Sequence, residues 1–475
     1  MFTLNDILQG NAGKIRVVGT TAPDPQLVFH AAHHDSRQIT LDDLFIAIKG
    51  AKVDGHRFIA TAARAGARAA LCVEPANDVP SDFLQIIVPD VVEALHATVR
   101  QRIQRQTETI YIGITGSNGK TSTKEAVASV LSRVAPTLKT YASYNTEIGF
   151  PLTLLQLEPE HRFAVLEMGA QWVGELAMLC TIARPDWSIV TNVGTSHLEY
   201  FGSQERIALA KSEIVQALTS EGIAILNYDD PLVQAMHEKT NARILYYGLA
   251  PEAHVRASDI GGDTLRGLSF TLHYQQESIR IQLHLPGEHG ITIALAAAAA
   301  GLSAGLPLTE IKIALEQLHT FKRRGEIKPG FHGSTVIDDS YNASRKSILA
   351  IAHAMHDAPI QGGSKRWAVL GDILELGSFA PEEHRITGAE IAHQVDYLVA
   401  IGDNARYFVE GAITAGMPSA HTYYYQADIE NQKELDAAKQ AAITMLKEQI
   451  QKEDLVLVKA SLGVGMDTIV NALLA

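Results

Sequence analysis

The sequence predicts an α/β protein of three domains: a small N-terminal α/β domain, a central parallel-sheet domain, and a C-terminal, Rossmann-like doubly wound domain. At 475 residues the chain is too long for a single hydrophobic core. Short apolar runs alternate with helical patterns in two separate stretches, which indicates two buried parallel sheets with crossover helices. We place the domains at residues 1–106, 107–320 and 321–475.

The N-terminal unit combines strand-like and helical segments with one candidate anion-binding loop. Strands are expected at 44–48 and 69–73, and a helix at 91–105. Ser36 and Arg37 lie on a predicted loop, where a hydroxyl and a forked guanidinium could hold a diphosphate. A solvated surface arginine fits this pattern equally well. The polar residues around the end of the helix are a plausible linker to the next unit.

The central unit opens with the pattern of a phosphate-binding loop, Tyr111-Ile-Gly-Ile-Thr-Gly-Ser-Asn-Gly-Lys-Thr-Ser-Thr-Lys124. An apolar strand leads into a turn with two glycines, and a helical pattern then begins at Lys120. Backbone N–H groups of such a turn, together with the helix N-terminus, cradle phosphates. Lys120 can neutralise the outer phosphates, and the hydroxyl of Thr121 can bind Mg²⁺. The match is imperfect, because Ile114 stands where the full pattern has glycine.

Further strands and helices continue the central unit. They are expected at 163–169, 187–194 and 222–227, followed by antiparallel strands at 268–274 and 279–285, an alanine-rich helix, and a helix at 308–318. Glu167 and His197 fall near the carboxyl edge of this sheet, where they could hold Mg²⁺ beside a γ-phosphate. A hydrogen-bonded loop histidine explains His197 equally well. By spacing alone, Lys211 is an ordinary exposed helix lysine.

The C-terminal unit begins after a basic connector, residues 321–330, and shows a second alternation of strands and helices. Its strands are expected at 334–339, 365–372, 397–402, 421–425 and 454–461. Polar residues such as Asp339, Asp372 and Lys459 lie just after or at the ends of these strands. Ligands bind at this edge of doubly wound sheets.

Composition restricts the partners and the compartment. The net charge of −13 argues against a nucleic-acid partner, since binding a phosphate backbone needs clustered Lys and Arg. With only Cys72 and Cys180, a disulfide framework is not expected, and a reducing cytoplasm fits. The start of the chain lacks the pattern of a signal peptide. The uncharged stretch 290–309 is rich in alanine and contains Pro307, so we expect a buried helix rather than a membrane span.

Several motifs, in order along nearly the whole chain, resemble those of the Mur ligases, which are ATP-dependent enzymes that add amino acids to a peptidoglycan precursor. They are Thr115–Thr121, Asn145–Pro151, Glu167–Gly169, Thr191–His197, Lys211–Glu213 and Pro286–His289. Further stretches resemble the members whose incoming amine is D-alanyl-D-alanine, namely Asp35–Arg37, Asp338–Ala343, Leu370–Gly377, and His384 with Gly388.

The resemblance implies a site between the central and C-terminal domains. ATP would bind Gly116, Ser117, Asn118, Gly119, Lys120, Thr121, Ser122, Asn145, Arg324 and Asp339. Two Mg²⁺ ions would use Thr121, Glu167, His197 and Lys211, the last as a lysine carbamylated by CO₂. Ser36 and Arg37 would hold the uridine diphosphate end of a UDP-N-acetylmuramoyl-tripeptide. The catalytic groups would be Lys120, His197, Lys211 and Arg324. We expect a cytoplasmic monomer.

The sequence departs from the family pattern at three places. Gly290 and Ile293 replace two asparagines, Ser344 and Arg345 replace Asn and Pro, and Ala460 and Leu462 replace Gly and Arg. These positions concern adenine recognition and the amine site, so two alternatives stay open. One is a related ligase that adds diaminopimelate or lysine, although the Asp-Asn-Pro-Arg motif of the diaminopimelate-adding relative is absent. The other is a nucleotide-binding scaffold without turnover.

Overall fold

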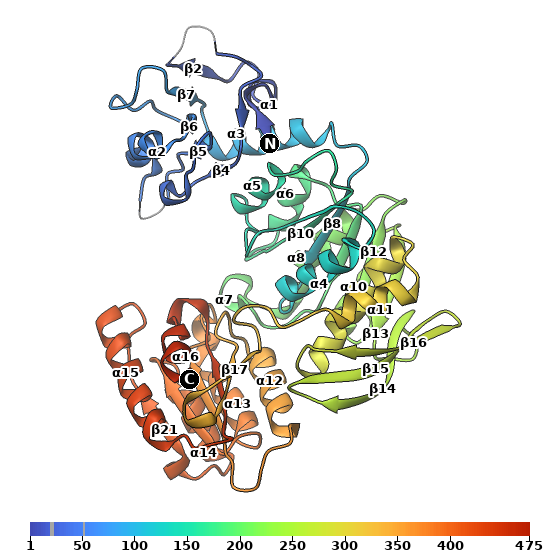
Figure 1. Cartoon of the computed structure of the whole chain (residues 1–475), viewed down its shortest axis with the longest axis vertical. Helices are drawn as coiled ribbons and strands as arrows, with labels where there is room; N and C mark the ends of the chain where they lie inside the picture. The colour runs from blue at the N-terminus through green and yellow to red at the C-terminus, as the bar shows by residue number, and fades with distance from the viewer. Residues whose placement is uncertain (20–22, 51–52) are drawn as a thin grey trace.

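The computed structural model describes residues 1–19, 23–50 and 53–475, and it confirms the three-domain α/β architecture. The domains follow one another along the long axis of the molecule, with the N-terminal domain at one end and the C-terminal domain at the other (Figure 1). Each is built on its own sheet. The boundaries near residues 107 and 321 stay predictions.

The N-terminal domain has a five-stranded sheet in the order β2-β7-β6-β5-β4, with a separate pair, β1 and β3. The strands are β1 (Phe2–Thr3), β2 (Arg16–Val18), β3 (Val28–Phe29), β4 (Ala32–His33), β5 (Leu44–Ile46), β6 (Ala69–Cys72) and β7 (Leu84–Ile87). The helices are α1 (Leu4–Gly10), α2 (Ile59–Ala65) and α3 (Val91–Ile103). Helix α3 begins where the Asp90 carboxylate accepts hydrogen bonds from two backbone N–H groups of its first turn.

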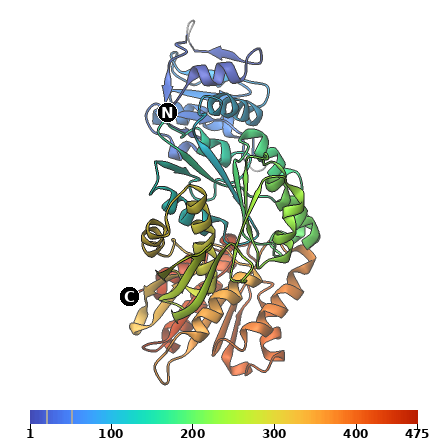
Figure 2. The same cartoon turned by 90° about the vertical axis from the view of Figure 1, so that its right-hand side faces the viewer.

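The central domain has a nine-stranded sheet in the order β16-β15-β14-β13-β12-β11-β8-β10-β9. Its strands are β8 (Ile110–Thr115), β9 (Thr137–Lys139), β10 (Phe163–Glu167), β11 (Trp187–Val190), β12 (Ile223–Asn227), β13 (Arg243–Gly248), β14 (Val255–Asp263), β15 (Gly267–Tyr274) and β16 (Glu277–Leu283). Neighbours from β9 to β14 are parallel, whereas β15 and β16 are antiparallel as expected. The antiparallel extension reaches down beside the C-terminal domain (Figure 2).

The helices of the central domain are α4 (Lys120–Leu131), α5 (Gly149–Leu154), α6 (Glu175–Ile182), α7 (Leu198–Phe201), α8 (Gln204–Gln216), α9 (Pro231–Gln234), α10 (Gly287–Ser303) and α11 (Leu308–Glu316). Helix α10 is the alanine-rich helix, and its residues 296–300 are fully buried, as predicted. Small side chains let α10 approach α4 closely, since a Cβ at Gly301 would lie 2.6 Å from Val130 Cγ1. No helix within the described ranges is long and apolar enough to cross a membrane.

The C-terminal domain has a six-stranded sheet in the order β17-β18-β22-β19-β20-β21. The strands are β17 (Glu326–Pro329), β18 (Thr335–Asp338), β19 (Arg366–Gly371), β20 (Tyr397–Ile401), β21 (Thr422–Tyr425) and β22 (Leu455–Lys459). All five predicted strands are present and are parallel to one another. The predicted connector 321–330 was wrong in part: it contains β17, which pairs antiparallel with β18.

Helices cover both faces of this sheet, as expected for a doubly wound fold. They are α12 (Arg345–Asp357), α13 (Ala380–Ile391), α14 (Arg406–Thr414), α15 (Gln432–Gln449) and α16 (Asp467–Leu473). Helices α13 and α14 pack especially closely through two glycines. A Cβ at Gly388 would lie 2.0 Å from Phe408 O, and one at Gly411 would lie 2.0 Å from Arg385 O.

We therefore expect Gly388→Ala to destabilise the C-terminal domain by roughly 1–3 kcal/mol, because the added methyl group forces α13 and α14 apart. The measurement is the shift of the urea midpoint of unfolding, followed by circular dichroism. Gly362→Ala is the matched control, since the site is exposed and no atom of the described residues lies within 4 Å of where its Cβ would stand. Equal midpoints for the two variants would contradict this packing argument.

Candidate active site

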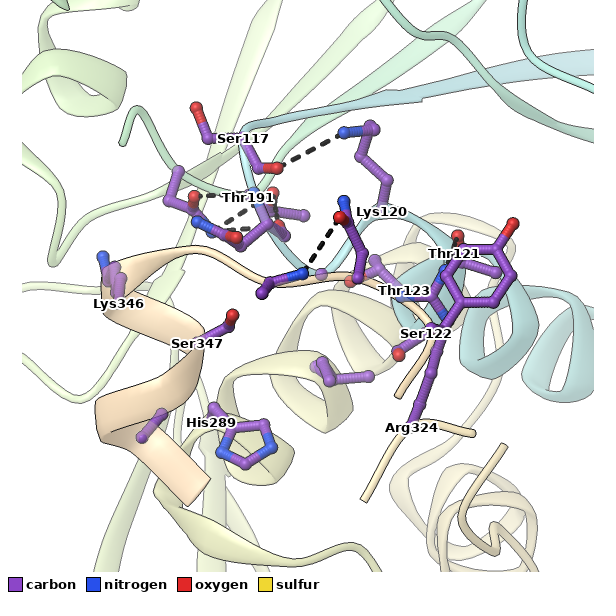
Figure 3. Close-up of a pocket in the computed structure, with 18 of the residues that line it drawn as sticks. Ser117, Lys120, Thr121, Ser122, Thr123, Thr191, His289, Arg324, Lys346 and Ser347 are labelled. Atoms are coloured by element: carbon purple, nitrogen blue, oxygen red, sulfur yellow. Dashed lines mark hydrogen bonds between the residues drawn. The ribbon is translucent and has the colours of Figure 1, made fainter. Parts of the chain in front are cut away.

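A cavity of about 1040 Å³ lies where the central and C-terminal domains meet. From the central domain it is lined by the phosphate loop, Asn145, Glu167 and His197. From beyond residue 320 it is lined by Arg324, Asp339 and other residues of the C-terminal sheet edge. Most of the predicted nucleotide and metal residues are therefore brought together at the carboxyl ends of two sheets. Figure 3 shows Arg324 beside the residues of the phosphate loop.

The phosphate loop has the backbone expected of an anion cradle. Strand β8 ends at Thr115, and α4 begins at Lys120 after a turn in which Gly116 has φ 150° and Gly119 has φ 80°. A Cβ at Gly116 would lie 1.8 Å from Thr191 Oγ1, so only glycine allows the loop to pack against the end of β11. The Thr191 hydroxyl donates to Asn118 O at 2.7 Å. These contacts hold the loop open for a ligand.

Among the described residues, four Lys or Arg side chains line this cavity: Lys120, Arg324, Lys346 and Lys459. The Lys120 ammonium donates to Gly116 O at 2.7 Å, and burial lowers its pKa from the ordinary lysine value. Arg324 donates to the Thr121 hydroxyl at 2.9 Å, with its guanidinium 4.2 Å from the centre of the Tyr341 ring. Lys459 was not among the predicted site residues, although the sequence placed it at a strand end; it contacts the Asp339 carboxylate at 2.5 Å.

Glu167 presents one free carboxylate oxygen to the cavity. Asn145 donates from Nδ2 to Glu167 Oε1 at 2.7 Å, whereas the buried Oε2 has no hydrogen-bond partner among the described residues. A buried, unpaired carboxylate oxygen on a residue that lines the same cavity as Thr121 suits a hard cation such as Mg²⁺, which prefers oxygen ligands. The residues present therefore fit a metal ion at this position.

His197 also lines the cavity, and its Nδ1 lies 2.5 Å from Glu375 Oε2 of the C-terminal domain. The two atoms are within ion-pairing distance, but their geometry is not that of an aligned hydrogen bond. Lys211 is not among the residues that line the cavity, and its role as a metal ligand stays a prediction. It lies buried on α8 with 2% exposure, near enough to Lys120 for the two charges to interact. The alternative prediction from spacing alone, that Lys211 is an ordinary exposed helix lysine, was wrong, because the side chain is buried.

Burial, and next the charge of Lys120, lower the pKa of the Lys211 ammonium well below its ordinary value. Within the described ranges, no group of three or more His, Cys, Asp or Glu side chains could hold a metal ion. A metal here would therefore depend on one carboxylate, one imidazole and ligands of other kinds, such as a hydroxyl or a modified lysine.

Asp339 lines the cavity and accepts a hydrogen bond from the Gly325 N–H at 3.1 Å, which places it beside the start of β17. Ser36 and Arg37 lie outside the cavity, in a 3₁₀ turn of the N-terminal domain. The Arg37 side chain is 87% exposed and pairs with Asp35 at 2.7 Å.

The departures Gly290 and Ile293 both line the cavity. A Cβ at position 290 would lie 2.9 Å from Leu285 Cβ, so an asparagine there would need the neighbouring backbone to shift. Ser344 donates to Asn118 Oδ1 at 2.7 Å and so joins the C-terminal domain to the phosphate loop. The sequence analysis did not predict that Ser344 contacts the phosphate loop, and it did not predict that Glu375 belongs to the site. The signal for both residues was their position in or next to motifs that resemble the family.

Comparison with known proteins agrees with this geometry. Three family models match successive parts of the chain: the Mur ligase family catalytic domain at residues 28–105, the Mur ligase middle domain at 114–301, and the Mur ligase glutamate ligase domain at 323–462. The chain belongs to the Mur ligase family. It is thus an ATP-dependent ligase with a three-domain Mur ligase fold.

Similar Mur ligases cover nearly the whole chain. The UDP-N-acetylmuramoyl-tripeptide--D-alanyl-D-alanine ligase of Mycobacterium bovis is 34% identical over 99% of this chain and 95% of its own length. The Escherichia coli protein of the same name is 34% identical over 94% of each chain. A crystal structure of MurF from Acinetobacter baumannii has a TM-score of 0.85 at 30% identity, covering 99% of this chain and 98% of that one. Thermotoga maritima MurF in complex with ADP has a TM-score of 0.78 at 25% identity, covering 94% and 97%.

Two lysines of α4 allow a test of the phosphate loop. We expect Lys120→Ala to weaken ATP binding by about 10- to 150-fold, since it removes a charged hydrogen-bond donor, while the melting temperature changes little. Lys124 is the matched control: it is fully buried and donates to Thr140 O and Ala142 O at 2.7 and 3.1 Å, outside the cavity lining.

For Lys124→Met we expect the ATP affinity to change little and the melting temperature to fall by a few degrees, because two carbonyl groups lose their hydrogen-bond donor. Calorimetric titration with ATP and thermal unfolding check both variants. An ATP affinity unchanged in Lys120→Ala would contradict the assignment of the loop.

Proposed function

We propose that this Mur ligase joins D-alanyl-D-alanine to the peptide carboxylate of UDP-N-acetylmuramoyl-tripeptide, with conversion of ATP to ADP and phosphate, in peptidoglycan precursor synthesis. The observation that carries the proposal is the cavity shared by the phosphate loop, Glu167, His197 and Arg324 between two domains. Relatives of that name, similar over nearly the full length, support the choice of substrates. The diaminopimelate-adding ligase structure is more distant, at 18% identity and a TM-score of 0.52.

In this proposal the triphosphate of ATP lies on the phosphate loop, with its N–H groups, Ser117 and Ser122 around it. Asn145, Arg324 and Asp339 contribute from the cavity wall. The ADP complex of the Thermotoga relative supports a nucleotide site in this fold. Thr121 and Glu167 would hold one Mg²⁺, and His197 with Lys211 a second. Bound there, the two ions would neutralise phosphate charge and polarise the γ-phosphoryl group.

The reaction proceeds in two displacements. A peptide carboxylate oxygen attacks the γ-phosphorus, and the bond to ADP breaks, which leaves an acyl phosphate. The dipeptide amine then attacks the acyl carbon, phosphate leaves, and the amine loses a proton. Because the first step brings two anions together, it needs concentrated positive charge, and Lys120 with Arg324 supplies it at the cavity wall. The contacts between the two domains exclude water from the acyl phosphate.

Lys211 is proposed to carry a carbamate. Its neutral amine forms a bond to the carbon of CO₂ and releases a proton, which converts a cation into an oxygen-bearing anion that Mg²⁺ prefers. The lowered pKa supports this step. At a given pH, a larger fraction of this buried amine is neutral than of an ordinary lysine amine, and only the neutral amine reacts. The same change would remove the repulsion between Lys211 and Lys120.

The N-terminal domain is proposed to bind the uridine diphosphate end of the substrate through Ser36 and Arg37. Arg37 is free to reach a ligand by exchanging its exposed contact with Asp35. Both substrates are small molecules, and the enzyme is proposed to act as a monomer in the cytoplasm. Sedimentation of the purified chain tests the oligomeric state.

The central prediction concerns substrate dependence. We expect rapid release of inorganic phosphate from ATP only when the UDP-linked tripeptide and D-alanyl-D-alanine are both present, because the amine must consume the acyl phosphate. A coupled phosphate assay with D-alanyl-D-alanine, lysine and diaminopimelate measures this, and mass spectrometry of the product identifies the amine. Phosphate release indifferent to the dipeptide would refute the proposed substrate, and ATP binding without turnover on any amine would favour a scaffold.

A second prediction concerns Lys211. We expect Lys211→Ala to lower turnover by roughly 100-fold or more, as for the loss of one charge-stabilising group, and short carboxylates to restore part of it. A carbamate signal in ¹³C NMR with labelled CO₂ should be present in the native chain and absent from the variant. A native chain without that signal, or a variant with full activity, would contradict the carbamate.

A further inference from the structure

The loop that carries His197 is held by the C-terminal domain. His197 lies between β11 and α7, while Glu375 lies in the loop after β19, and the Glu375 carboxylate reaches across the domain junction to His197 Nδ1 at 2.5 Å. Both side chains line the cavity. Since Nδ1 is taken up by this contact, Nε2 is the ring nitrogen left for a ligand.

The backbone on both sides of the contact is unusual. His197 has φ 60° and Glu375 has φ 62°, in the left-handed region that residues other than glycine rarely adopt. Such strained conformations persist where the surroundings over-determine them, and they cluster at active sites and switch regions. Neither residue is a glycine, so each side chain is retained at a conformational cost.

Two hydrogen bonds and one close approach hold the Glu375 loop in place. The Glu199 N–H donates to Glu375 O at 3.2 Å, and Gln171 Nε2 donates to Glu375 Oε1 at 3.2 Å. Gly377 follows with φ 52°, and a Cβ there would lie 2.9 Å from Glu199 Cγ. The C-terminal loop thus fits against the His197 loop with no room for a larger residue.

Charge favours the same arrangement. The Glu375 carboxylate is within ion-pairing distance of the His197 ring, and it lines the same cavity as the Lys120 ammonium. An ionised carboxylate on one ring nitrogen orients an imidazole, fixes its tautomer and raises the basicity of the other nitrogen.

We propose that Glu375 is a positioning residue that holds His197 with Nε2 toward a bound divalent cation, so that the metal site is complete only when the C-terminal domain is closed. The inference rests on the proposed metal role of His197. It explains why a carboxylate of the C-terminal domain lies in the cavity wall close to the phosphate loop. It also couples domain closure to the metal, since the ligand and its orienting group come from different domains.

The experiment is a titration of the full-length protein with Mn²⁺ in the presence of ADP, followed by electron paramagnetic resonance of the free ion. The variants are Glu375→Gln, which keeps the size of the side chain, His197→Ala, and the double variant. Glu382→Gln is the control, because it removes an exposed carboxylate of the same domain outside the cavity. Circular dichroism verifies that each variant is folded, and Glu375→Asp replaces Glu375→Gln if the latter is not.

We expect Glu375→Gln to weaken Mn²⁺ binding by about 10- to 100-fold, as for other groups that orient a metal ligand, and Glu382→Gln to leave it unchanged. In the His197→Ala background, the Glu375 substitution should have no further effect. An equal loss of Mn²⁺ affinity with and without His197 would mean that Glu375 is itself a ligand. Native Mn²⁺ affinity in Glu375→Gln would mean that Glu375 has no role. Either result overturns the inference. If the native chain binds no Mn²⁺ with ADP, the proposed metal site fails as well.

Discussion

The interaction on which the site depends is the repulsion among cationic side chains gathered away from water. Burial lowers the pKa of Lys120, Lys211 and Lys459, and a neighbouring cation lowers each further. The carboxylates of Glu167 and Asp339 compensate part of this charge. The remaining positive potential is unfavourable by itself, and an anionic ligand relieves it. A triphosphate bound at the domain junction would therefore be stabilised by these cations.

This arrangement requires two domains to meet. Arg324 reaches Thr121 across the junction, Ser344 reaches Asn118, and the hydroxyl of Tyr341 lies 2.5 Å from that of Ser143. Each contact ends on the phosphate loop or close to it, so movement of the C-terminal domain changes the surroundings of the nucleotide directly. Arg324 donates to the same Thr121 hydroxyl that is proposed to bind a metal.

Much of the fold followed from patterns that are local in the sequence. The glycine turn, the buried parallel strands and the five C-terminal strands were predicted because apolar runs and turn residues reflect them directly. Strands β13 and β14 were not predicted, because β14 carries exposed polar residues and two glycines in its second half. Strand β17 was missed because its residues are charged and proline-bearing, and it is stabilised only by pairing with β18 at the edge of the sheet.

The sequence by itself determined the chemistry of the phosphate loop, since Gly116, Lys120 and Thr121 act through neighbouring backbone and side-chain atoms. Only the tertiary structure decided which distant groups face that loop. It brought the Glu375 carboxylate into contact with His197, and it placed Lys459 in the cavity wall. It buried Lys211 near Lys120, outside the cavity lining. Those positions arise from the packing of separate sheets and from charge interactions across a domain junction, which spacing along one chain does not encode.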